Sequence, residues 1–204
     1  MAKKAKDSFY IKYNMKWVLL ITLWTFILAI GLSVVAENLV RELDVLFAFI
    51  LLLFFISVGI LFDIIGIAVT ASNERPFHSM AANKIDEART AIKLVRNSSQ
   101  VSNFCNDVIG DISGIISGAV ATSIVFRLVS VLGLKNGTLL TIVLTGFTAS
   151  LTVGGKGVGK AIASYHHDVI ILKVARIVYF FEKLFKVEIF ATKKKPKNDR
   201  IKEK

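Results

Sequence analysis

The chain has 204 residues, of which 54% are hydrophobic and 20% are charged, and its formal net charge at pH 7 is +11. Together with a mean hydropathy of +0.61, this composition is typical of a membrane protein and argues against a soluble globular domain. The single cysteine, Cys105, excludes an intrachain disulfide and a cysteine-rich metal site.

Four apolar stretches follow a basic segment at residues 1–16, and each is expected to cross a membrane as a helix. Because a helix rises about 1.5 Å per residue, roughly 20 apolar residues span the hydrocarbon core. The first span has an alternative interpretation as a cleaved signal peptide, but its apolar core is longer than such peptides usually carry. The predicted fold is therefore an all-α integral membrane protein with about four transmembrane helices, at residues 17–36, 45–70, 108–128 and 139–153.

Two amphipathic segments, at residues 76–96 and 160–190, are predicted to be helices at the cytoplasmic membrane interface. Lysine and arginine gather before the first span, between the second and third spans, and after the fourth. This bias predicts a multi-pass protein of the cell membrane with both termini cytoplasmic. The basic tail at 191–204 should attract anionic membrane lipid. Nucleic acid is not expected as a partner, because no aromatic residues alternate with these lysines.

A glycine-rich run from Gly154 to Lys160 has the spacing G-x-x-x-x-G-K of a phosphate-binding loop. Such a loop continues with Ser or Thr to ligate magnesium, whereas Ala161 follows here. We therefore expect a turn where the chain leaves the fourth span. No nucleophile with an adjacent base can be identified, so an enzyme is not expected.

Small and polar residues form one face on each of the second and third spans. The second carries Asp63 among glycines, and the third carries Asp111 with Ser113 and Ser117. A carboxylate inside a span costs several kcal/mol unless it faces a partner, water or a cation. Oxygen ligands favour hard cations, so these four residues are the predicted metal ligands for bound Mg²⁺ or Na⁺, and no other cofactor is expected. Two alternatives remain open: close helix packing, and aspartates that reach the lipid headgroups.

Three stretches resemble the transmembrane domain of the CNNM (cyclin M) and CorB/CorC magnesium and cobalt transport proteins. They are "LFDIIGIAVTASNERPFHSMAANKIDEARTAIKLVRN", "VIGDISGIISGAVATSI" and "VGGKGVGKAIASYHHDVIILKVARIVYFFEKLF". The resemblance implies a homodimeric domain over residues 45–190, with residues 17–36 as an extra helix. It also implies divalent-cation transport, with ions held among polar side chains and helix carbonyls.

Several family positions differ in this chain. The family's first-helix serines fall on Asp63 and Ile65, and its two glutamates fall on Gly66 and Lys156. Its proline falls on Gly159, while Lys160 is retained. A nucleotide-binding CBS pair usually follows this domain, whereas a short basic tail follows here. The resemblance therefore implies no nucleotide regulation within the chain, and regulation would need a separate cytoplasmic protein.

These observations predict a membrane transporter or exchanger of a cation. The family resemblance implies that this cation is divalent and magnesium-like. The alternative is a non-transporting membrane scaffold or partner protein that kept the fold and lost the ion site. Loss of the two glutamates favours the scaffold, whereas the aspartates in the spans favour the transporter.

Overall fold

A computed structural model describes residues 15–42, 44–133 and 137–185, and these residues form helices without any strand. The elements are α2 (Met15–Glu42), α3 (Val45–Ala71), α4 (Glu74–Ala82), α5 (Asp86–Arg96), α6 (Ser98–Asn103), the π-helix η1 (Phe104–Gly110), α7 (Asp111–Leu132) and α8 (Thr138–Phe185). The all-α prediction is confirmed. Within this part of the chain, three helical segments are long and apolar enough to cross a membrane: Val45–Ala71, Ser98–Leu132 and Thr138–Leu184.

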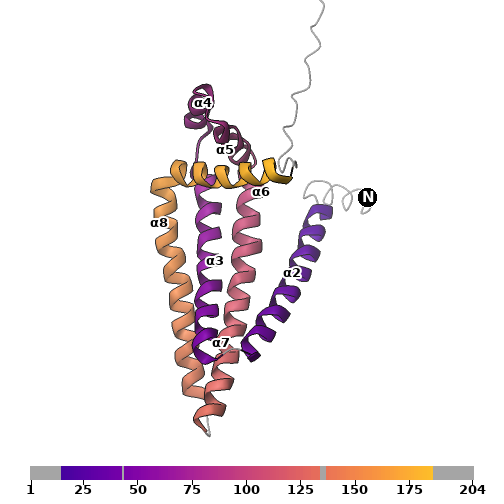
Figure 1. The fold of residues 1–204 in the computed structure, drawn as a ribbon, viewed down its shortest axis with the longest axis vertical. Helices are drawn as coiled ribbons and strands as arrows, with labels where there is room; N and C mark the ends of the chain where they lie inside the picture. The colour runs from indigo at the N-terminus through magenta and orange to yellow at the C-terminus, as the bar shows by residue number, and fades with distance from the viewer. Residues whose placement is uncertain (1–14, 43, 134–136, 186–204) are drawn as a thin grey trace, which may run out of the picture.

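The three long helices α3, α7 and α8 run side by side as a bundle (Figure 1). Helix α3 packs antiparallel against η1 and α7, so that Gly66 meets Asn106 and Gly59 meets Ser113. It packs parallel to the first half of α8, where Gly155 and Gly159 meet isoleucines of α3. Glycines let neighbouring backbones approach closely, which is the usual way for helices to associate in lipid. Helix α3 is therefore in contact with both of the other spans.

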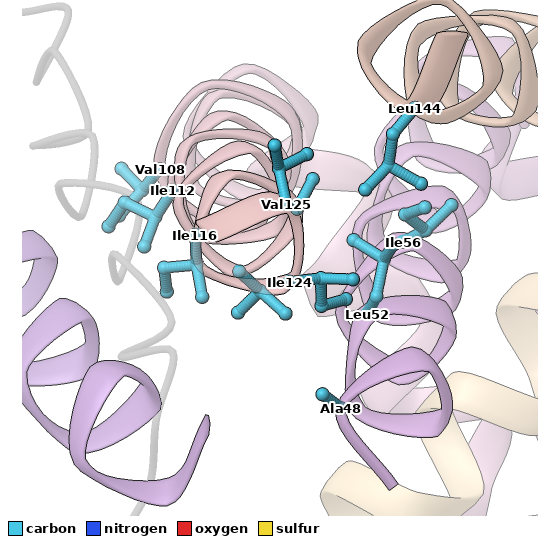
Figure 2. Close-up of a cluster of buried hydrophobic side chains, with 11 residues drawn as sticks. Ala48, Leu52, Ile56, Val108, Ile112, Ile116, Ile124, Val125 and Leu144 are labelled. Carbon is cyan, nitrogen blue, oxygen red and sulfur yellow. The ribbon is translucent and has the colours of Figure 1, made fainter. Parts of the chain in front are cut away.

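Two apolar clusters occupy the two ends of the bundle. Figure 2 shows part of the first cluster, in which Leu52 and Ile56 of α3 face Ile124 of α7 and Leu144 of α8 points toward Ile56. The second cluster joins the C-terminal end of α3 to α4, α5, α6 and α8, with Phe77 fully buried. Along α3, residue 63 falls between the buried residues of the first cluster, which end at Ile56, and those of the second, which begin at Ala68. A polar layer therefore separates two apolar regions.

The amphipathic segment at 76–96 forms two helices rather than the single one that its periodicity predicts. Helix α4 ends at Ala82 and α5 begins at Asp86. Between them Lys84 has a φ of 63°, in the left-handed region that a helix cannot accommodate. The prediction of one continuous helix is wrong at this point, and the two short helices fold back on each other at one end of the bundle (Figure 1).

Helix α8 passes through the glycine-rich run without a break, so the predicted turn at Gly154–Lys160 is wrong. The helix keeps its form because Gly155 and Gly159 pack against Ile60 and Ile64 of α3. A phosphate-binding loop is excluded for the same reason, since this segment is helical. The non-helical residue is His166, with φ −119° and ψ 25°. Beyond it, residues 167–185, here called the α8 arm, cross the ends of α3 and α7 (Figure 1).

Helix α2 stands at the edge of the bundle and contacts α7 (Figure 1). Leu28 and Ala29 reach the first apolar cluster, while large apolar side chains such as Trp24 and Phe26 are exposed. The described apolar stretch of this helix, Thr22–Val35, is shorter than the three long segments. The predicted basic segments at 1–16 and 191–204 and the end of the predicted helix at 160–190 lie wholly or mostly outside the described residues.

Candidate cation site

Asp63 is the buried carboxylate of the bundle, with only 6% of its surface exposed. It lies on α3 and faces the backbone of Gly110 at the end of η1. A Cβ atom on Gly110 would sit 3.9 Å from Asp63 Oδ1, so the glycine leaves this side of the carboxylate open. An ionised carboxylate removed from water needs a compensating charge or hydrogen bonds. Its surroundings therefore decide what the site can bind.

The ammonium of Lys156 on α8 is the cationic group beside Asp63. Its Nζ lies 3.8 Å from Asp63 Oδ1. A charge-assisted N–H···O hydrogen bond has a heavy-atom distance of about 2.7–2.9 Å, so this contact is electrostatic rather than a hydrogen bond. The other oxygen, Oδ2, is buried and has no hydrogen-bond partner among the described residues. Lys156 therefore neutralises the carboxylate but leaves it incompletely coordinated.

A second unpartnered oxygen lies one helical turn away. Asn106 of η1 donates a hydrogen bond from Nδ2 to Ser102 Oγ at 3.2 Å, while its Oδ1 has no partner in the described part of the chain. The amide packs against Gly66, where a Cβ atom would lie 2.6 Å from Asn106 Cγ and closer still to Oδ1. Gly66 follows Asp63 by three residues on the same face of α3. The glycine thus creates the space into which the amide oxygen points.

The π-helix η1 carries both groups that face α3 here, Asn106 and Gly110. Its hydrogen bonds run from residue i to i+5, so the turn is wider than in an α-helix, and such turns occur frequently at functional sites. Buried acceptors without donors are costly in a folded protein. A bound cation would give these two oxygens the partner that they lack. The site offers only oxygen ligands and one negative charge, which suits a hard cation.

The structure places the four predicted ligands differently. Ser113 is buried beside Gly59, whose Cβ would lie 3.2 Å from its Cβ, one turn along α3 from Asp63. Ser117 is buried farther along, and its hydroxyl donates to the Gly114 carbonyl at 2.9 Å. Asp111 is exposed. It is two positions from Ser113, which is a rotation of about 200° around a helix, so Asp111 and Ser113 cannot serve one site.

Within the described residues, no group of three or more histidine, cysteine, aspartate or glutamate side chains can hold a metal ion. Asn106 and the pairing of Lys156 with Asp63 were not predicted from the sequence. A signal for Asn106 was present, because small or polar residues recur at helical spacing at Ser102, Asn106, Gly110, Ser113 and Ser117. This stripe is the one that meets Gly59, Asp63 and Gly66 of α3.

No protein family, curated protein or solved structure matches this chain.

Proposed function

We propose that this protein is a membrane transporter or exchanger of a cation, with its ion site in the polar layer formed by Asp63 and Asn106. The observation that carries the proposal is the buried Asp63 carboxylate, which keeps an oxygen without a donor inside a helix long enough to span a membrane. Ionisable groups at such positions are rare, and they commonly mark ion pathways. The two unpartnered atoms beside the Lys156 ammonium are oxygens, which favour a hard cation as the ligand.

The position of the site within the bundle supports transport rather than a purely structural role. Asp63 lies eight residues before the end of α3 at Ala71, a distance of about 12 Å along the helix axis. Apolar clusters lie on both sides of it along the bundle. An ion held there is separated from both ends by apolar side chains, as alternating access requires. The proposal includes the resemblance to the CNNM and CorB/CorC proteins, with α2 as a fourth span and both termini cytoplasmic.

A homodimer belongs to the same proposal. Gly114 and Gly118 on α7 have nothing within 4 Å of where a Cβ would lie. Spacing of four residues between small side chains is the pattern through which membrane helices associate. A second copy of the chain would bury this face.

A non-transporting scaffold is the second candidate, and one observation favours it. Lys156 already neutralises Asp63 without any bound ion, as a fixed structural ion pair would. A replacement of Asp63 by asparagine then removes a buried charge and should affect the fold more than any ion flux.

Flux into proteoliposomes distinguishes the two candidates. Purified protein would be reconstituted, and entry of sodium, magnesium and cobalt measured against empty vesicles. We expect flux of at least one cation in the parent and its loss in Asp63→Asn, because the amide keeps the size of the side chain but removes the charge. Asp111→Asn is the matched control, since the same change on an exposed residue should leave flux intact. Absence of flux for all three cations in the parent would overturn the transporter and leave the scaffold.

A further inference from the structure

The contact between Lys156 and Asp63 has the geometry of an ion pair whose two groups can separate. A lasting buried ion pair is short and hydrogen-bonded, because only good geometry offsets the loss of hydration of both charges. Here the two groups are 3.8 Å apart, and the second carboxylate oxygen has no donor among the described residues. The ammonium is therefore close enough to neutralise Asp63 but does not supply the hydrogen bond that its second oxygen lacks.

The ammonium also has room to leave. The Lys156 side chain is 24% exposed, against 9% for that of Asp63. Lysine carries its charge on a flexible four-carbon stem, so the head group can move while the stem stays in apolar surroundings. A partly exposed ammonium on such a stem can separate from Asp63 by rotation about its own side-chain bonds.

Charge balance then selects the ion. With Lys156 withdrawn, one carboxylate remains, and a singly charged cation restores a net charge of zero, as the ammonium did. A divalent ion would leave a net charge of +1 in a region of low dielectric constant, where uncompensated charge is unfavourable. Sites that hold divalent ions through protein groups generally combine several charged ligands. Asp63 is the only buried carboxylate in the described part of the chain.

We propose that the Lys156 ammonium is an internal competitor of a small, hard, singly charged cation, with sodium as the probe, for the Asp63 carboxylate. Sodium would take the place of the ammonium beside Asp63, with the Asn106 carbonyl oxygen one turn away. This inference rests on the proposed cation site and names its substrate class. It departs from the divalent ion that the family resemblance implies, because Lys156 stands where that family has a glutamate.

Direct binding tests the competition. Radioactive sodium would be equilibrated with the purified full-length protein in detergent, at constant ionic strength set with an organic cation. Lys156→Met should bind sodium about tenfold more tightly than the parent or better, because removing a unit charge near 4 Å relieves a large repulsion. Lys160→Met is the matched control, since it removes the same charge from an exposed residue one turn along α8 and should leave sodium affinity unchanged. Equal affinities in the parent and Lys156→Met would overturn the proposal.

Stability provides a second measurement if Lys156→Met folds poorly. The variant leaves Asp63 without a counter-charge, so its melting temperature should be low without sodium and should return toward that of the parent as sodium is added. The double variant Asp63→Asn/Lys156→Met should show no response to sodium. A melting temperature of Lys156→Met that sodium does not raise, or that magnesium raises at lower concentration than sodium, contradicts the proposal.

The two proposals fail separately. Sodium binding that depends on Lys156 as described, without flux in proteoliposomes, overturns transport and retains the competition. Flux with a sodium affinity that Lys156→Met does not change overturns the competition and retains transport.

Discussion

Two glycines beside Asp63 determine the space that the polar layer occupies. Gly66 admits the amide of Asn106, and Gly110 leaves the backbone of η1 open toward the carboxylate. Neither glycine has a positive φ, so both are required for space and not for backbone conformation. A side chain at position 66 would fill the volume into which the unpartnered Asn106 oxygen points, and one at position 110 would crowd the contact between Asp63 Oδ1 and the Lys156 ammonium.

The first prediction concerns the substitution Gly66→Ala. Its new methyl group would overlap the Asn106 amide, with Nδ2 at 2.9 Å and Cγ at 2.6 Å. We expect the free energy of unfolding in micelles to fall by about 1–3 kcal/mol, as overpacked sites generally show, and sodium binding to weaken. In an Asn106→Ala background the same substitution should cost far less, because the clashing amide is gone.

Gly146→Ala is the control for this experiment. Gly146 is exposed on α8 and has open space around its Cβ position, and alanine favours a helix over glycine by about 1 kcal/mol. Its stability should be unchanged or higher. Equal stabilities of Gly66→Ala and the parent would mean that the amide does not occupy this space.

The sequence allowed one of these residues to be predicted as a site and concealed others. Asp63 is conspicuous because it interrupts an apolar span. Asp111 interrupts its span in the same way but is exposed, and a charge alone does not say which side of a helix faces the neighbours. Asn106 was missed because an amide is less conspicuous than a carboxylate, and because the π-helix that presents it depends on hydrogen bonds that composition does not encode.

Helix by helix, the α8 arm packs against the other amphipathic segment that the sequence predicted, at residues 76–96. Arg176 Nε lies 3.2 Å from Glu87 Oε1 of α5, and Thr90 donates to Glu182 at 3.5 Å. At the kink, Ser72 Oγ and His167 Nδ1 are 3.5 Å apart. The glycine run predicted a break at the wrong place. Its glycines stay helical because they pack against α3, and the kink lies farther along α8, at His166. These contacts hold α5 against the α8 arm and the end of α3 against its start.

The prediction for these elements uses Glu87, whose pKa is lowered by a hydrogen bond from its own backbone N–H and, less strongly, by Arg176. A lowered pKa in the folded state means that the charged carboxylate stabilises the fold above the ordinary glutamate pKa. The stabilisation is lost as the pH falls through the lowered folded value. Glu87→Gln should therefore have a lower melting temperature than the parent at neutral pH, and the two should converge below about pH 4.

Arg176→Gln is the companion variant, because it removes the ion pair and leaves the backbone hydrogen bond. Its loss of melting temperature at neutral pH should be smaller than that of Glu87→Gln, since the backbone hydrogen bond, the largest single cause of the lowered pKa, remains. A difference between parent and Glu87→Gln that widens with acidification would contradict the assignment.

For the whole molecule, the arrangement of the helices and the distribution of charge indicate the same orientation. Helices α4 and α5 lie at one end of the bundle with the α8 arm (Figure 1). These helices and the residues between them carry a basic set: Arg75, Lys84, Arg89, Lys93 and Arg96. Helix α2 runs from that end toward the start of α3 (Figure 1). With 28 residues it is about 42 Å long, enough to cross a membrane. The three helical segments long and apolar enough to cross a membrane were predictable because length and hydropathy decide them, whereas the contacts between these segments were not.

We predict from the positive-inside rule that the α4–α5 end faces the cytoplasm, and introduced cysteines test this orientation. In a Cys105→Ala background, thiols at Asp44 and Leu139 lie at the opposite end, where α3 and α8 begin. Intact cells treated with a membrane-impermeant thiol reagent should label these two. Thiols at Asn83 and Asp86, both exposed between α4 and α5, should react only after the membrane is permeabilised. Labelling of the second pair alone in intact cells would reverse the orientation. Labelling of all four would show that the bundle does not cross the membrane, and the ion site would then lose its physical basis, because Asp63 would no longer lie in a barrier.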